Sequence, residues 1–117
     1  MSPLTDALFA LSPKVRYVAV LRGKELLLRE RPGLTGASAS ETDRYEELLV
    51  NPAVLTLLRR RGELDCGGLD HVWIRYGNFW TGLFPTADGH VNVGLEPDAV
   101  PMEHVDGIRA ELARGLG

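Results

Sequence analysis

The sequence lacks several features that mark whole classes of protein. It contains a single cysteine, Cys66, so no disulfide can form within the chain, and a reducing compartment is expected. No apolar run approaches membrane-spanning length, and the first residues lack the basic-then-apolar pattern of a signal peptide. No phosphate-binding glycine loop, nucleophile elbow or zinc-ligand spacing occurs. These absences predict a cytoplasmic protein that is not an enzyme and carries no cofactor or metal.

The composition is that of one ordinary globular domain. The chain has 117 residues, of which 44% are hydrophobic and 25% charged, and we expect a single α+β domain over residues 1–117. A net charge of −3 gives no general attraction to nucleic acid or to anionic lipid. A domain of this size buries only about two-thirds of its unfolded surface, so pairing with a second copy would add useful core.

The stretch 69–95 carries most of the aromatic side chains and is predicted to form three antiparallel strands. Gly77 and Asn78 are typical of a two-residue hairpin turn, which would place Tyr76 opposite Phe79. Side chains alternate between the two faces of a strand, so the turn also fixes which residues share a face. One predicted face is almost wholly apolar and is assigned to the core: Val72, Ile74, Tyr76, Phe79, Thr81 and Leu83.

The opposite face of the same hairpin is aromatic. Trp73 is expected opposite Gly82, and Trp80 opposite Arg75, whose guanidinium can stack on the indole. Two interpretations are open for this face. Either the middle helix covers it, or part of it forms, together with that helix, a surface for self-association or for a partner.

The histidines are interpreted as ordinary surface or interface residues. The longer return turn at 85–89 suggests that Phe84 lies opposite His90, which would align His71, Phe84 and His90 in one row across three strands. The two imidazoles would then be roughly 9–10 Å apart, too far for one zinc ion. The same register would place three further residues on the apolar core face: Val91, Val93 and Leu95.

Two other features have simple interpretations. Cys66 and His71 are five positions apart, across two glycines and the beginning of a strand, and no third orienting residue is implied. We interpret Cys66 as a small, partly buried residue. The three arginines at 59–61 are interpreted as a solvated helix end, with contact to an acidic partner surface as the alternative.

The remaining helices and strands are predicted from the spacing of apolar residues and from the positions of glycine and proline. A first helix is expected to begin at Ser2 and Pro3, and a hairpin over 15–31 to turn at Gly23 and Lys24. A long middle helix over 41–61 is interrupted at Asn51. There it is either kinked by the following proline or split, with Asn51 capping the second half. Gly62 is expected to end that helix. A last helix presents an inner stripe: Val105, Ile108 and Leu112.

The order is thus helix, two strands, helix, three strands, helix. In this order, and in the Gly23 hairpin, the middle helix 41–61 and the hairpin at Gly77 and Asn78, the chain resembles the roadblock / dynein light chain family. The resemblance implies one central five-stranded antiparallel sheet of order 2-1-5-4-3 with helices on both faces. Profilin-like and longin-like domains have related sheets.

The resemblance also implies a mode of action. It leaves the strand at 69–76 at an edge, where pairing of two copies would give a ten-stranded sheet with the middle helices side by side. Similar domains scaffold or regulate small GTPases, including those of bacterial polarity and motility, so a small Ras-like GTPase is the implied partner. The alternative is a monomeric profilin-like sensory or small-ligand-binding module using the face of Trp73 and Trp80. A small enzyme using Cys66 ranks last. The residues expected at the dimer or partner surface are Tyr45, Leu48, Leu49, Leu55, Trp73 and Arg75.

Overall fold

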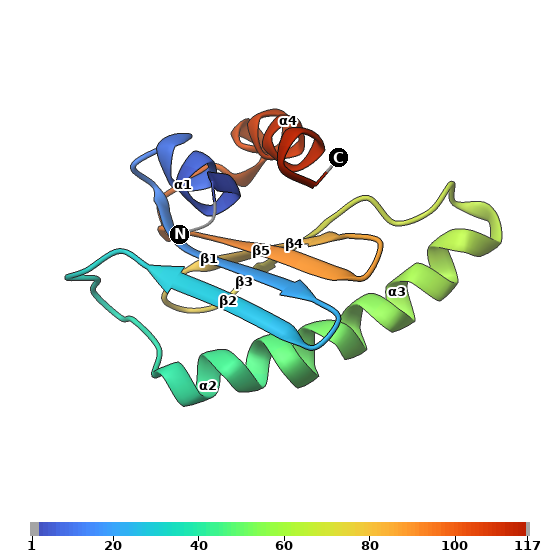
Figure 1. Cartoon of the computed structure of the whole chain (residues 1–117), viewed down its shortest axis with the longest axis horizontal. Coiled ribbons are helices and arrows are strands. Elements are labelled where there is room, and N and C mark those ends of the chain that lie inside the picture. The colour runs from blue at the N-terminus through green and yellow to red at the C-terminus, as the bar shows by residue number, and fades with distance from the viewer. Residues whose placement is uncertain (1–2, 117) are drawn as a thin grey trace.

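The computed structural model describes residues 3–116 and contains one five-stranded antiparallel sheet between two layers of helices. The sheet order is β2-β1-β5-β4-β3, as predicted. Helices α1 and α4 lie on one face, and α2 and α3 run along the other (Figure 1). The elements are α1 (Pro3–Ala10), β1 (Val15–Arg22), β2 (Glu25–Glu30), α2 (Ser40–Tyr45), a π-helical segment (Glu46–Val50), α3 (Asn51–Asp65), β3 (Val72–Arg75), β4 (Trp80–Pro85), β5 (Gly89–Leu95), a 3-10 turn (Pro101–Glu103) and α4 (Val105–Leu116).

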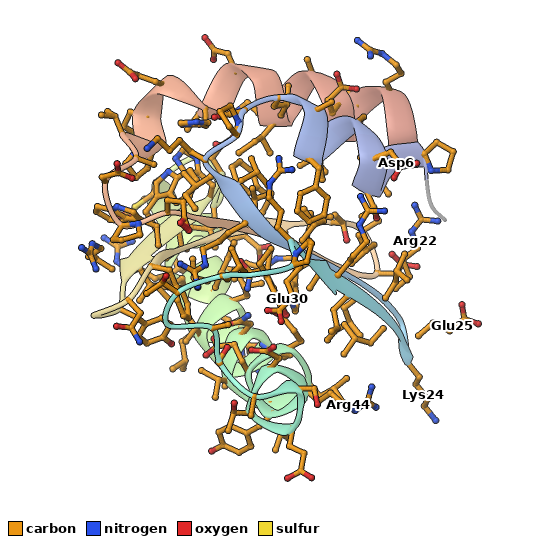
Figure 2. All side chains as sticks on the ribbon, turned by 90° about the vertical axis from the view of Figure 1, so that its left-hand side faces the viewer. Asp6, Arg22, Lys24, Glu25, Glu30 and Arg44 are labelled. Carbon is orange, nitrogen blue, oxygen red and sulfur yellow. The ribbon has the colours of Figure 1, made fainter. Side chains whose placement is uncertain are left out.

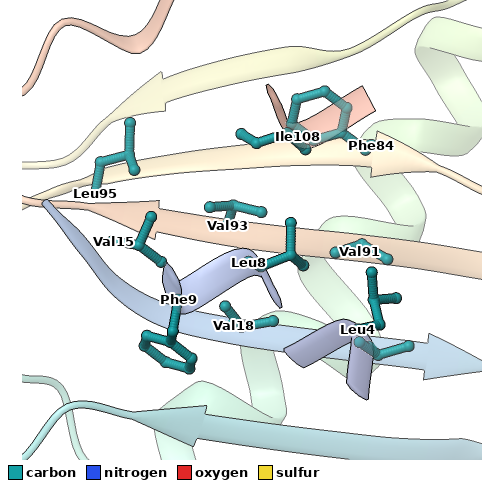
Figure 3. Close-up of a cluster of buried hydrophobic side chains, with 11 residues drawn as sticks. Leu4, Leu8, Phe9, Val15, Val18, Phe84, Val91, Val93, Leu95 and Ile108 are labelled. Atoms are coloured by element: carbon teal, nitrogen blue, oxygen red, sulfur yellow. The ribbon is translucent and has the colours of Figure 1, made fainter. Parts of the chain in front are cut away.

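The main hydrophobic core lies between the sheet and the two terminal helices (Figure 3). The predicted inner stripe of α4 is confirmed, since Ile108 is fully buried and Leu112 packs against the core. The expected cap at Ser2 falls outside the described residues. None of the helices in the described part of the chain is long and apolar enough to cross a membrane. The core consists of Leu4, Leu8, Phe9, Val15, Val18, Val20, Phe84, Val91, Val93, Leu95 and Ile108.

Both short hairpins have the predicted register, whereas the longer return turn does not. Phe84 pairs with Val91, and His90 pairs with Pro85. Pro85, which has no N–H, can remain the last residue of β4 because the next residue makes the hydrogen bond that closes the turn. The backbone N–H of Thr86 donates to the carbonyl of Gly89 at 3.0 Å. A slip of one residue moves every following side chain to the other face. The placement of Phe84 opposite His90 is therefore wrong.

This slip exchanges the roles assigned to the two faces of the sheet. The face of Trp73, Trp80 and Phe84 packs against the core beneath the terminal helices, so the interpretation that the middle helix covers it is wrong. The middle helix covers the opposite face, where Tyr17, His90 and Asn92 contact it. Figure 2 shows the sheet between the two sets of helices, with the middle helix viewed nearly along its axis.

The middle helix is continuous across Asn51 and Pro52 rather than split. Asn51 has helical dihedral angles, φ −63° and ψ −43°, and its N–H bonds to the carbonyl of Glu46, five residues earlier. This wider π turn accommodates the proline, which has no N–H of its own. The expectation that Asn51 caps a second helix is therefore wrong.

Gly62 does not end the helix, which continues to Asp65. A Cβ on Gly62 would lie 3.1 Å from backbone atoms of Gly68 and Leu69, so glycine is needed where the chain returns toward the sheet. The carbonyl of Gly62 also accepts hydrogen bonds from the backbone N–H groups of Cys66 and Gly68, each at 3.0 Å.

Replacing Gly82 by alanine should disturb the aromatic part of the core. A Cβ there would lie 2.3 Å from the ring of Trp73, so we expect Gly82→Ala to lower the free energy of unfolding by about 1–3 kcal/mol. Gly77→Ala is the matched control, because nothing lies within 4 Å of its Cβ position, and it should change stability by less than about 0.5 kcal/mol. Urea denaturation of both variants measures the difference, and equal stabilities would show that Trp73 is not held over Gly82.

Candidate functional site

A buried carboxylate joins the middle helix to the sheet. Glu47, in the π-helical segment, is 0% exposed and accepts four side-chain hydrogen bonds. Its Oε1 faces Asn51 Nδ2 at 2.9 Å and His90 Nε2 at 2.7 Å. Its Oε2 accepts from the Tyr17 hydroxyl and from Asn92 Nδ2, both at 2.7 Å. Two bonds to each oxygen use the acceptor capacity of the carboxylate, which is what a buried charge requires.

The periodicity of each element brings these residues together. Asn51 follows Glu47 by four residues along the helix, and His90 and Asn92 alternate onto one face of β5. The earlier interpretation of His90 as a surface or interface residue is wrong, since it is 1% exposed. His71 lies on the other face of the sheet, stacked on Phe84 with ring centroids 5.3 Å apart. Among residues 3–116 no group of three His, Cys, Asp or Glu side chains could hold a metal ion.

A cavity of about 220 Å³ lies beside Glu47, between the sheet, the start of the middle helix and the loop that precedes it. Four carboxylates line it, and among the described residues Arg16 is the one cation that does so. Arg16 is 3% exposed and already bonded, through Nη1 to Glu96 Oε1 at 2.9 Å and through Nη2 to the Thr35 carbonyl at 3.0 Å. The carboxylates are Glu30, Asp43, Glu46 and Glu47.

Burial and negative charge raise the pKa values of groups around this cavity. Burial raises the pKa of Glu46, against a hydrogen bond from the Tyr76 hydroxyl at 3.0 Å, and the nearby carboxylates of Glu47 and Asp43 raise it further. Burial and Glu46 together raise the pKa of Tyr76 to about 12. Burial, followed by the charge of Glu47, also raises the pKa of Tyr17. The cavity therefore favours positive charge.

Three of the residues predicted for the dimer or partner surface lie on the outside of the middle helix. Tyr45 and Leu49 are each 60% exposed, and Leu48 is 37% exposed. The prediction did not include Leu57 and Leu64, which are 69% and 79% exposed on the same helix. Leu57 lies within the predicted helix 41–61 and was left out of the predicted surface, whereas Leu64 lies beyond Gly62, where the helix was expected to end.

The other three predicted surface residues are placed differently. Leu55 is 4% exposed and buried within the chain, and Trp73 packs against the core on the opposite face of the sheet. Arg75 is exposed. Its guanidinium lies 5.7 Å from the centre of the Trp80 ring, which confirms the predicted stacking. It also donates hydrogen bonds to the carbonyls of Tyr76 and Gly77.

Cys66 is exposed, so its interpretation as a partly buried residue is wrong. Its Sγ lies 3.4 Å from Asp65 Oδ1, whereas His71 Nδ1 lies 2.5 Å from Asp70 Oδ2. Each group therefore has an acidic neighbour of its own. Arg61 pairs with Asp65 at 2.6 Å, as expected of a solvated helix end.

The prediction from sequence missed Glu47 entirely. One signal for it was present, because Asp43, Glu47 and Asn51 recur at spacings of four, as the buried residues of a helix do. Asp43 is 9% exposed, and the other two are fully buried. Polar residues at core spacing on a helix are a pattern of buried hydrogen bonding.

Glu47→Gln should destabilise the fold although it preserves the shape of the side chain. A glutamine nitrogen would face either the Asn51 and His90 pair of donors or the Tyr17 and Asn92 pair, so at least one buried donor loses its acceptor. We expect a loss of about 2–4 kcal/mol in the free energy of unfolding, measured by urea denaturation. Glu63→Gln, at an exposed position of α3, is the control and should change stability by less than about 0.5 kcal/mol.

Tyr17 should make the fold sensitive to alkali. Its folded pKa is raised, so its contribution to stability is complete below the ordinary phenol pKa of 10.0 and is lost as the unfolded chain releases a proton above it. Above that pKa, the free energy of unfolding of the wild type should fall more steeply with rising pH than that of Tyr17→Phe, by about 1.4 kcal/mol per pH unit. Urea titrations between pH 9 and pH 11 (roughly one unit either side of that pKa) compare the slopes, and parallel curves would contradict the assignment.

Comparison with known proteins supports the fold. A scan against models of protein families and a search among curated proteins both find no match. Among solved structures, the chain is similar to the gliding protein MglB from Thermus thermophilus, with a TM-score of 0.60 and 11% sequence identity. The match covers 96% of this chain and 82% of that one. The chain therefore has a roadblock-like α+β fold.

Proposed function

We propose that the chain is a non-enzymatic, homodimeric scaffold or regulator of a small Ras-like GTPase. The observation that carries the proposal is an apolar surface on the outside of the middle helix. We call it the middle-helix surface. It comprises Tyr45, Leu48, Leu49, Leu57, Leu58 and Leu64, each between 37% and 79% exposed.

This surface is larger than an isolated exposed leucine. Contiguous apolar side chains on a soluble domain usually mark a binding interface. Beyond Leu55, Gly62 is the one buried residue of α3, so the second half of the helix is largely exposed within the described chain. A helix that is exposed over this length and also apolar gains stability from a second helix.

The edge of the sheet beside this surface supports pairing of two copies. In the part of the chain that the structure describes, β3 is one of the two edge strands and pairs with β4 alone. The Tyr76 hydroxyl donates to Glu46 at 3.0 Å, which ties the end of this strand to the middle helix. Self-pairing of an exposed edge protects it from aggregation. We therefore retain Arg75 in the proposed interface and leave out Leu55 and Trp73.

The GTPase partner rests on the fold and on resemblance. The chain has the roadblock-like architecture, and one of its structural neighbours is a gliding protein, which agrees with a role in motility. A homodimer would present each partner surface twice, as suits a scaffold. The arrangement requires no reactive side chain, so Cys66→Ser should leave binding unchanged.

The dimer is tested by placing charge on the middle-helix surface. Leu49→Asp should weaken self-association by about thirtyfold or more, the effect of losing one well-buried interface leucine. Leu27→Asp is the control, because Leu27 is 46% exposed on β2, at the far edge of the sheet. Sedimentation velocity at micromolar concentration measures both, and a wild type that is monomeric there would show the dimer to be wrong.

The partner is tested by affinity purification from the native cytosol, with GTP or GDP added. We expect a small GTPase to be retained in one nucleotide state and lost with Leu49→Asp if the dimer is required. Retention of no GTPase in either state would contradict the proposed partner.

A further inference from the structure

The strand β2 forms the second edge of the sheet, and its outer side is open. Within the described chain it pairs with β1 alone. Just after β2, the backbone N–H of Arg31 donates to the carbonyl of Arg16 on β1 at 2.9 Å. Because such hydrogen bonds alternate along an antiparallel strand, odd-numbered residues of β2 direct their backbone groups to β1 and even-numbered residues direct theirs outward. Leu26, Leu28 and Glu30 therefore present unpaired N–H and C=O groups at this edge.

The side chains at this edge are largely apolar. Three consecutive leucines, Leu26 to Leu28, lie in the middle of β2, and none of them is buried. Leu27 is 46% exposed. Proline and β-bulges commonly protect edge strands, but β2 contains no proline and its register with β1 is regular. An apolar edge of this kind is a site at which another strand can extend the sheet.

Backbone geometry limits how two copies of β2 can pair antiparallel. Outward-facing residues must lie opposite one another, so a two-fold symmetric ladder is centred on a single residue of the strand. With Leu27 at the centre, each Leu27 faces its own copy on one side of the sheet, and Leu26 faces Leu28 on the other side. Facing side chains in such a ladder have Cβ atoms about 4.5–5.5 Å apart. With the centre moved to Leu26 or Leu28, Leu27 would instead face a charged residue, Glu25 or Arg29.

The charges of the strand agree with the register centred on the middle leucine. That register places Glu25 opposite Arg29 and Lys24 opposite Glu30, and each pair occurs twice by symmetry. Opposite charges in facing positions stabilise a ladder, whereas like charges destabilise it. Lys24 and Glu30 are exposed and lie at the two ends of the strand (Figure 2). Arg29 already bonds to Asp6 at 2.8 Å and has enough N–H donors to meet a second carboxylate.

We propose that β2 is a second self-association surface, at which two copies pair antiparallel about a two-fold axis between their Leu27 side chains. The ladder is short, so this contact forms at submillimolar rather than micromolar concentration. It does not depend on the proposed dimer through the middle-helix surface. Where that dimer also forms, as the proposed function requires, the two edges join copies alternately into an open-ended array of continuous sheets.

The test is sedimentation velocity of the wild type and of Leu27→Asp, from micromolar concentration to about 0.5 mM. We expect the average mass of the wild type to rise over this range, and that of Leu27→Asp to stay constant because a charge then faces a charge at the centre of the ladder. Concentration-dependent NMR shifts of the Leu26 and Leu28 backbone amides locate the contact. A wild type of constant mass, or an equal rise in the variant, would overturn the proposal.

This readout separates the two contacts. The state at micromolar concentration reports on the middle-helix dimer, whereas the rise toward submillimolar concentration reports on β2. If the proposed function fails, the wild type starts from a monomer, and the rise that Leu27→Asp abolishes is then from monomer to dimer.

Charge exchange tests the register. Lys24→Glu places like charges opposite Glu30 and should weaken the submillimolar step by about tenfold. The double variant Lys24→Glu/Glu30→Lys restores opposite charges at the wild-type net charge, so it should recover most of the association. Thermal denaturation checks that both variants fold. A double variant that associates no better than Lys24→Glu would overturn the register centred on Leu27.

Discussion

The four hydrogen bonds to Glu47 are the constraint on which the arrangement of the middle helix depends. A carboxylate can be buried only where enough donors meet it, and here the donors come from β1, β5 and the helix itself. Because the strands hold Tyr17, His90 and Asn92 in fixed positions, the helix can satisfy Glu47 in one rotation about its axis. The network thus supplies the specificity that a purely apolar helix–sheet contact would lack.

That rotation decides which side chains face outward. Residues two positions from Glu47 lie on nearly the opposite side of a helix, and Tyr45 and Leu49 are accordingly 60% exposed. The π turn at Glu46–Val50 preserves this orientation across Pro52, where a break would have turned α3 independently. The middle-helix surface is therefore a consequence of the buried polar contact, and a protein that exposes so many leucines gains by covering them.

The sequence predicted the fold well because its turns are locally determined. The two-residue turns at Gly23 and Lys24 and at Gly77 and Asn78 fix their strand registers, and Gly23 has the positive φ of 60° that is typical of the first position of such a turn. The turn after β4 is longer, so its register depends on tertiary contacts that no local pattern contains. One slipped residue was enough to hide the site, because it placed His90 on the wrong face of the sheet. The choice between a continuous and a split helix at Asn51 was left open by the sequence, since a π turn depends on the surrounding packing.

The two faces of the sheet differ in how they are packed. The face under α1 and α4 is closed by apolar packing, whereas the opposite face combines buried apolar residues with the buried polar residues His90 and Asn92 and borders the cavity beside the middle helix. The middle-helix surface and the cavity therefore lie on the same side of the molecule. The hydrogen bond from Tyr76 to Glu46 connects them, since Tyr76 ends the edge strand and Glu46 lines the cavity.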